Sequence, residues 1–148
     1  MDALEFLQTL VDRQLCYGLK SPDMDLYDFG FGNSVSVLNL EAKEEIICTH
    51  FLHVTCRFKL IWKNGERRVE RFFADTPCNK FHDEIKRLVG LKVRRVALSS
   101  KHDLWLDFGD YWIVFATFEN GEESWRFFIH DKKVPHVIAS DSYLHFSG

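Results

Sequence analysis

The chain has few of the residues that interrupt or cross-link a fold. Its 148 residues include three prolines, eight glycines and four cysteines, and no two cysteines form a CxxC pair. No segment approaches the ~20 apolar residues of a membrane-spanning helix, and the first residues lack the basic start of a signal peptide. We therefore expect one globular domain over residues 1–148, with reduced thiols, in the cytoplasm and away from membranes.

The motifs that mark common enzymes are also missing. The sequence has no Gly-rich phosphate loop, no GxGxxG fingerprint, no HExxH helix and no GxSxG nucleophile turn. The carboxylates Asp107 and Asp110 flank Gly109, and aspartates in such turns usually bond their own backbone. These absences favour a protein without enzymatic activity, predict no cofactor and leave no catalytic residue to assign.

One run contains residue types that zinc prefers as ligands, namely Cys48, His50, His53 and Cys56. The spacing argues against a tetrahedral site. On a strand His53 points away from the other three, and on a helix Cys48 does. We therefore predict no metal site and interpret these side chains as structural.

Large side chains in alternating patterns dominate the sequence instead. Aromatic residues make up 15% of the chain, and 14 of them are Phe, which fits a β-rich core. Between Asp103 and His130, the turn signals Gly109-Asp110 and Asn120-Gly121 separate three apolar-alternating runs. They predict a three-stranded meander at the centre of a sheet, in which Val114 faces Phe127.

A second hairpin is expected at Asn64-Gly65. A two-residue loop there places Leu60 opposite Val69 and Lys59 opposite Glu70. The inner face would then hold Cys56, Phe58, Leu60, Trp62, Val69 and Phe73. Further strands are expected over 46–62, with a bend or bulge, near 93–98 and at the edge over 136–146.

The first forty residues and the middle of the chain give the remaining elements. Apolar residues three and four apart predict amphipathic helices over 2–16 and 77–89. The second would have Thr76 or Asn79 as its N-cap and Gly90 just past its end. Between the helices, Gly30 and Gly32 indicate a turn before a strand with a bulge near Val37-Leu38.

The two halves of the chain look related. The stretch DLYDFG (25–30) resembles DLWLDFG (103–109), and 61–73 resembles 117–128. We therefore predict an α+β fold: a mainly antiparallel, twisted sheet or pair of half-sheets, built from two related β-units by duplication, with two helices packed on it. Two helices cannot cover both faces of such a sheet, so either the two halves pack against each other or a partner covers the remainder, for which a homodimer is one candidate.

Charge is unevenly distributed along the chain. Arg57 to Arg95 has 12 Lys and Arg against 5 Asp and Glu, although the whole chain has 19 against 22. The hairpin mixes bases with aromatic residues, as nucleic-acid-binding sheets do. Its expected register puts Lys59 and Arg71 on opposite faces, and the isoelectric point of 6.1 is low for such a binder. We therefore do not expect nucleic acid as a partner.

Several stretches carry a resemblance to a known group of proteins. They are FLHVTCRFKLI (51–61), the helix near 80–89, DLWLDFG (103–109), ESWRFF (123–128) and PHVIAS (135–140). Over residues 25–140 the sequence resembles a family of small uncharacterised bacterial proteins, a domain of unknown function. The resemblance implies a compact α+β domain without an assigned activity, and it suggests an immunity protein that neutralises a toxin.

Two functions follow as hypotheses. The first is a non-enzymatic, cytoplasmic bacterial interaction protein, of the immunity type, whose acidic segments Asp103–Asp110 and Glu119–Glu123 meet a basic protein partner. The alternative is a small ligand-binding or hydrolase-like domain with a pocket between the half-sheets. That pocket would be lined by Trp105, Trp112, Trp125 and Arg126, where the guanidinium suits an anionic ligand.

Overall fold

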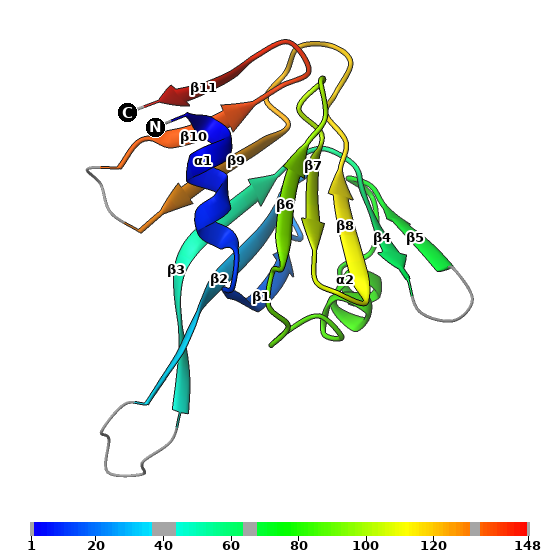
Figure 1. Cartoon of the computed structure of the whole chain (residues 1–148). Coiled ribbons are helices and arrows are strands. Elements are labelled where there is room, and N and C mark those ends of the chain that lie inside the picture. The colour runs from blue at the N-terminus through cyan, green and yellow to red at the C-terminus, as the bar shows by residue number, and fades with distance from the viewer. Residues whose placement is uncertain (1, 37–43, 64–67, 131–133, 148) are drawn as a thin grey trace.

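The computed structural model describes residues 2–36, 44–63, 68–130 and 134–147, which form two antiparallel sheets and two short helices (Figure 1). A six-stranded sheet has the order β1-β2-β3-β9-β10-β11, and a five-stranded sheet has the order β5-β4-β8-β7-β6. The expectation of an α+β fold with mainly antiparallel pairing is therefore confirmed. The strands of the first sheet are β1 (Gln14–Lys20), β2 (Tyr27–Ser36), β3 (Glu44–Val54), β9 (Trp125–Ile129), β10 (His136–Ala139) and β11 (Leu144–Ser147). Those of the second are β4 (Phe58–Trp62), β5 (Arg68–Phe72), β6 (Arg95–Leu98), β7 (Leu104–Asp107) and β8 (Tyr111–Phe115).

The two sheets share one apolar core. Phe29 on β2 is fully buried, and its ring lies 5.4 Å from that of Phe115 on β8 and 5.7 Å from that of Phe58 on β4. The chain crosses between the sheets twice, from β3 to β4 through 55–57 and from β8 to β9 through 116–124. Both crossings lie at the same end of the core, because the backbone N–H groups of Thr55 and Cys56 both bond the carbonyl of Ser124.

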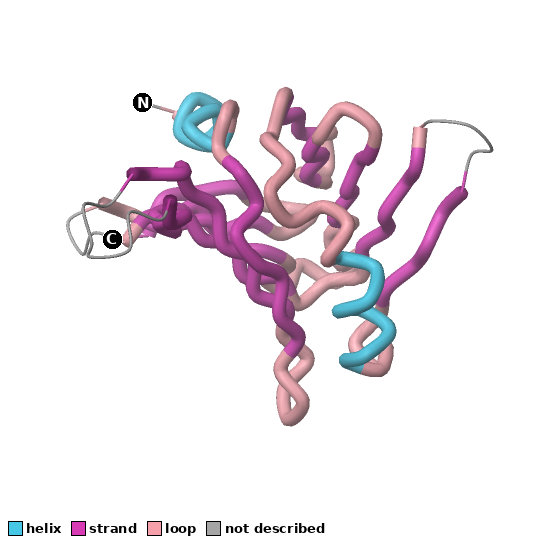
Figure 2. The backbone as a smooth tube through the Cα atoms, turned by 90° about the horizontal axis from the view of Figure 1, so that it is seen from below, coloured by secondary structure: helices cyan, strands magenta, loops and turns pink. Residues whose placement is uncertain are grey.

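The helices fill the gaps between the sheets. Helix α2 (Cys78–Ile85) lies between β1 and the β4–β5 hairpin (Figure 2), where the buried ring of Phe81 packs edge-on against Tyr27 and Phe72. Helix α1 (Ala3–Leu7) lies beside β9–β11 (Figure 1) and places Phe6 5.0 Å from Phe127. Neither helix has the length and apolar character needed to cross a bilayer, within the part of the chain that the structure describes.

The prediction of a helix over 2–16 is wrong beyond Leu7. A single 3₁₀ turn follows at Gln8–Leu10, Asp12 takes a left-handed φ of 72°, and β1 begins at Gln14. The apolar spacing at the start of the chain fits a helix, but β1 pairs with β2 along one edge and hydrogen-bonds to residues 90–93 along the other. These tertiary contacts decide the conformation, and a local pattern does not contain them.

The second predicted helix exists but is shorter, and its caps differ. Neither Thr76 nor Asn79 caps it, since Pro77 is the N-cap residue and makes no side-chain bond. Thr76 Oγ1 instead accepts the N–H of Phe73, and Asn79 Oδ1 accepts that of Lys80. Turns carry the chain from Ile85 to Gly90, which has the expected positive φ, +92°.

The β4–β5 hairpin forms with a register one residue away from the expected one. Leu60 lies opposite Glu70, not Val69, and Lys59 lies opposite Arg71, not Glu70. Phe72 therefore faces the core and Phe73 is 45% exposed, the reverse of the prediction. The predicted two-residue loop at Asn64-Gly65 lies outside the described residues.

The predicted three-stranded meander is only half correct. Strands β7 and β8 form a hairpin around Gly109, with Asp107 opposite Trp112. The next strand, β9, joins the other sheet between β3 and β10, so Val114 does not face Phe127. Asn120-Gly121 lies in the crossing between sheets, because Phe127 finds its partners, Leu52 and Val137, in the six-stranded sheet.

Gly30 and Gly32 lie inside β2 and do not form a turn. A Cβ atom at Gly32 would lie 1.7 Å from the carbonyl oxygen of Ile47, and one at Gly30 would meet the ring of Tyr17. The register shift between Phe31 and Gly32 is the bulge that the structure describes, and the bulge expected near Val37-Leu38 lies outside the described residues. The strands expected at 93–98 and 136–146 are confirmed as β6, β10 and β11.

Candidate functional site

A cleft of about 1010 Å³ opens at the end of the molecule where the chain crosses between the sheets. Four segments that are far apart in the sequence line it: the β1–β2 loop, the first crossing, the turn after β5, and the second crossing. The lining residues are Met24, Asp25, Leu26, Thr55, Arg57, Phe73, Ala74, Asp75, Ala116, Thr117, Phe118, Glu119, Glu122 and Glu123.

The rim of this cleft is acidic. Asp25, Asp75, Glu119 and Glu122 are exposed, and none of them forms an ion pair within the described residues. Exposed carboxylates are ionised at neutral pH. The cleft therefore presents four unpaired negative charges to the solvent, with Arg57 as a positively charged group in the same lining.

Apolar side chains stand between these charges. Met24 is 60% exposed and Phe73 45% exposed, so two large apolar side chains reach the solvent in one cleft. Leu26 and Phe118 lie partly buried beside them. Apolar groups framed by charged ones are typical of surfaces that bind other proteins.

The acidic wall of the cleft is held rigidly by hydrogen bonds. Thr117 donates its backbone N–H to Asp103 Oδ1 (2.9 Å), and its hydroxyl bonds the same carboxylate. Gly121, with a φ of +77°, donates its N–H to Asp141 Oδ1 (3.0 Å). The Glu122 N–H binds Asn120 Oδ1. These bonds hold the backbone that carries Glu119 and Glu122.

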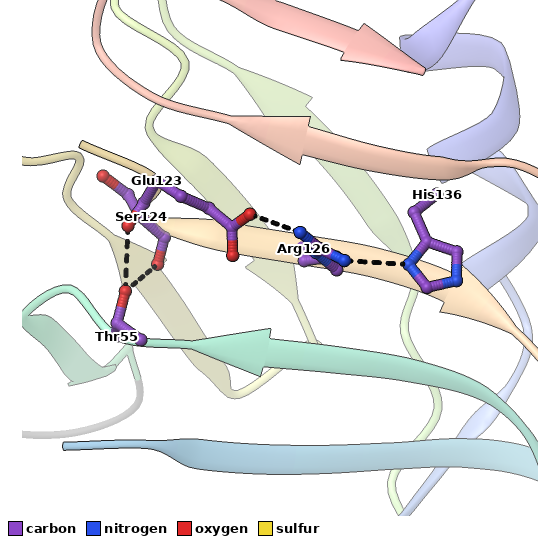
Figure 3. Close-up of polar contacts among 5 residues, drawn as sticks. All are labelled: Thr55, Glu123, Ser124, Arg126 and His136. Atoms are coloured by element: carbon purple, nitrogen blue, oxygen red, sulfur yellow. Dashed lines mark hydrogen bonds and ion pairs between the residues drawn. The ribbon is translucent and has the colours of Figure 1, made fainter. Parts of the chain in front are cut away.

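The first crossing is tied to this wall (Figure 3). Thr55 donates its hydroxyl to the carbonyl oxygens of Glu123 (3.0 Å) and Ser124 (3.3 Å). Its side chain therefore joins the two crossings directly, and the cleft has a hydrogen-bonded back wall.

Arg126 lies next to the cleft but faces the outer side of the six-stranded sheet. Its guanidinium donates to Glu123 Oε1 (2.7 Å) and lies 3.4 Å from Nδ1 of His136 (Figure 3). The ring of His136 stacks on Phe128, with 4.7 Å between centroids. Burial lowers the pKa of His136, and the charges of Arg126 and His53 lower it further. A neutral His136 therefore accepts the hydrogen bond from Arg126.

The four residues predicted to line one pocket lie in three places. Trp105 and Trp112 are neighbours, 5.8 Å apart, on the outer face of the five-stranded sheet. Trp125 is buried in the core and donates its indole N–H to the carbonyl of His102. Arg126 lies on the outer face of the other sheet. The pocket that would unite them is not formed, because β8 and β9 belong to different sheets.

The acidic segments predicted as a binding surface are divided as well. Glu119–Glu123 lines the cleft, whereas Asp103 binds Thr117 and Asp107 binds Lys63 (2.9 Å) and Arg95 (3.5 Å). Partial burial acts to raise the pKa of Asp107, but the hydrogen bonds from Lys63 and the Gly109 N–H outweigh it and lower the pKa. Asp25 and Asp75 replace these residues on the rim, and no sequence motif links them to Glu119.

The Cys/His run does not converge. His50 is buried and its Nδ1 lies 2.7 Å from Thr49 Oγ1, while His53 reaches Asp28 on the outer face of the sheet. Cys56 is buried at the first crossing. Among the residues whose placement is described, no three His, Cys, Asp or Glu side chains are grouped to hold a metal ion.

Comparison of the chain with protein-family models, with curated proteins and with solved structures finds no match. Functional inference therefore rests on the cleft, the surfaces and their chemistry.

Proposed function

We propose that the chain is a non-enzymatic interaction protein that binds a basic protein partner in the acid-rimmed cleft. The observation that carries this proposal is the set of four unpaired carboxylates around the exposed side chains of Met24 and Phe73. In a bacterial cytoplasm, neutralisation of a basic toxin is the role that fits both this surface and the resemblance to small bacterial proteins.

Electrostatics and apolar contact would have separate roles in such a complex. Uncompensated charges of one sign raise the rate of encounter with an oppositely charged partner, and they disfavour partners of the same sign. Burial of an exposed Phe and Met supplies free energy that charges at a wet rim do not, since each apolar Å² removed from water contributes about 25 cal/mol. The rigid second crossing reduces the ordering needed on binding.

The alternative of a small hydrolase or ligand-binding pocket between the sheets has less support. The space between them is occupied by packed rings such as Phe29, Phe58 and Phe115. The described lining of the cleft includes no His, Cys or Ser, so it cannot supply a Ser–His or Cys–His pair.

Two finer predictions from the sequence remain proposals: descent from two related β-units and association into a homodimer. The two similar stretches have different places in the fold. Residues 61–73 include parts of β4 and β5 in the five-stranded sheet, whereas 117–128 include the second crossing and part of β9 in the six-stranded sheet. Native mass spectrometry measures the homodimer directly.

The function is tested by charge reversal at the cleft. Wild-type protein and the double variant Glu119→Lys/Glu122→Lys are used as baits in bacterial lysate, and captured proteins are quantified by mass spectrometry. A double variant with equal charge change away from the cleft, Glu5→Lys/Asp83→Lys, is the matched control. We expect a basic protein that the wild type and the control capture and the cleft variant loses.

Purified partner then gives the affinity by calorimetry at two salt concentrations. Capture by all three baits alike, or a partner of acidic composition, would contradict the proposed function.

A further inference from the structure

The outer face of the five-stranded sheet differs in character from the cleft. The strand pairings place Arg71, Lys59, Val114, Trp105 and Ala97 in one row across β5, β4, β8, β7 and β6. No helix of the described chain covers this face (Figure 1). Its middle is apolar, and its two sides combine cations with aromatic rings.

Three cations gather at the β4–β5 side. Arg57, Lys59 and Arg71 line a hollow of about 430 Å³ together with the exposed ring of Phe73. Within the described residues none of the three cations pairs with a carboxylate. The sequence-based register separated Lys59 from Arg71, whereas the observed register places them side by side on one face.

A second hollow of about 370 Å³ lies at the β7–β6 side, next to Trp105 and Trp112. Arg95 and Asp107 also line it and form an ion pair (3.5 Å), and Ala97 contributes apolar surface. The ammonium of Lys63 lies 4.5 Å from the centre of the Trp112 ring and occupies that face of the ring. Trp105 is therefore the indole left to receive a ligand.

The first hollow thus joins an exposed ring to unpaired cations, and the second supplies a further ring, Trp105, beside cations that Asp107 pairs. Lys59 and Trp105 lie two strands apart in the same row, which is ~10 Å at the usual strand spacing. We propose that this face binds single-stranded nucleic acid, with bases stacked on Trp105 and Phe73 and phosphates held by Arg57, Lys59 and Arg71. Unpaired bases supply the exposed ring faces, and the backbone supplies the repeated negative charge.

The chemistry favours this ligand over an acidic protein or a duplex. Carboxylates alone would use the cations but would leave the indole and the phenyl ring exposed. A duplex presents phosphates, but its ring faces are stacked inside the helix. The net charge of −3 includes the carboxylates of the adjoining cleft, but Arg57, Lys59 and Arg71 are unpaired within the described residues, and salt screens charges farther than about 8–10 Å.

Fluorescence anisotropy with a labelled dT12 probe, on the full chain, tests the proposal. At ~50 mM salt we expect saturable binding, with a dissociation constant of ~10⁻⁵ M or lower. Three phosphate contacts on a single strand predict a loss of about twentyfold between 50 and 200 mM salt. Trp105→Ala should weaken binding roughly tenfold, and Trp105→Phe, which keeps a ring, should weaken it less.

Charge variants complete the test. Arg71→Glu should lower the affinity and reduce the slope of log K against log salt by about 0.7. Lys86→Glu is the matched control, because Lys86 is 70% exposed and follows α2, away from this face. Thermal melting checks that each variant is folded.

Several outcomes would overturn the proposal: no saturable binding of dT12 at 50 mM salt, a duplex bound as tightly as the single strand, or equal effects of Arg71→Glu and Lys86→Glu. Competition by poly-glutamate at equal charge concentration, with no effect of Trp105→Ala, would assign the face to an acidic protein instead. None of these outcomes bears on the acid-rimmed cleft, whose variants and partner are separate.

Discussion

At the scale of single residues, glycines of β2 show how closely two strands can approach. Gly32 is buried, and a Cβ atom there would overlap the backbone carbonyl of Ile47 on β3. Backbone that is paired in a sheet cannot move aside without breaking the ladder. The requirement for glycine therefore comes from a neighbouring strand, and it resembles a turn signal when only the sequence is read.

We expect Gly32→Ala to destabilise the fold by roughly 3 kcal/mol or more, at the upper end of the effect of overpacking. Gly18→Ala is the comparison, since its Cβ would meet Ile85 Cγ1 at 2.8 Å, a side-chain atom that can shift. It should be milder, about 1 kcal/mol. Urea denaturation of both variants measures the difference, and equal midpoints would contradict the explanation.

His50 makes stability depend on pH. Burial lowers its pKa to about 4, and the Arg13 guanidinium contributes to the shift. In the unfolded state the His pKa is ~6.5, so between pH 6.5 and 4 the unfolded chain binds a proton at His50 and the folded chain does not. The contribution of His50 to the free energy of unfolding is therefore fully present above pH ~6.5. It is lost as the pH falls from 6.5 toward 4, by up to roughly 3 kcal/mol.

The variant His50→Gln should flatten this loss, because no titrating group remains at the position. Free energies of unfolding at pH 7 and pH 4.5, measured for both proteins, give the contribution of His50 by difference. His136 also has a lowered pKa and is present in both proteins, so its effect cancels. Parallel pH profiles would show that His50 is not responsible.

At the scale of elements, alternation and turn residues located most strands but not their partners. The runs that became β4, β7, β8 and β9 were predicted from apolar alternation, and β10 and β11 from short apolar segments at the end of the chain. The sheet that each strand joins depends on contacts between Phe127 and residues such as Leu52, which are 75 positions away in the sequence. A local pattern cannot contain that choice.

The prediction of a helix over residues 2–16 was wrong for a related reason. Leu4, Leu7 and Leu10 have helical spacing, and the chain is helical or 3₁₀ through Leu10. The left-handed Asp12 then ends the pattern, and Leu15 becomes buried as a strand residue. The spacing from Leu10 to Leu15 fits either structure, so only the bonds to β2 and to residues 90–93 decide between them.

The observed register of β4 and β5 can be tested by cross-linking. Lys59 and Arg71 are directly opposite, so Lys59→Cys/Arg71→Cys should form a disulfide under mild oxidation. The pair Lys59→Cys/Glu70→Cys should not, since Glu70 faces the other side of the sheet. Peptide mapping without reduction distinguishes the new bond from any involving the four native cysteines. Cross-linking of the second pair alone would support the register expected from sequence.

At the scale of the whole molecule, the candidate site could be predicted only in part. The acidic segment Glu119–Glu123 was identified from its charge and does line the cleft. Asp25, Asp75 and Phe73 were not, because they reach it from separate loops and the hairpin register was off by one. The same error concealed the row of cations on the five-stranded sheet.

The two surfaces meet at one corner of the molecule. Arg57, Phe73 and Ala116 line both the acid-rimmed cleft and the hollow with Lys59 and Arg71. A change at Phe73 would therefore affect both proposed ligands, whereas Glu119 and Trp105 each belong to one. Variants at the latter two positions are the ones that separate the activities.

The insertion of β9 between β3 and β10 also has a consequence for synthesis. A ribosome releases β1–β3 early, but the strand that covers the free edge of β3 follows more than 70 residues later. At ~5–20 residues per second, that edge stays open for several seconds, with Phe51 and Leu52 on it. An unpaired apolar edge is a template for aggregation. The nascent chain should therefore need a chaperone until Ile129 has emerged from the ribosome. In the finished fold β9 covers this edge of β3, so the edge is no longer exposed.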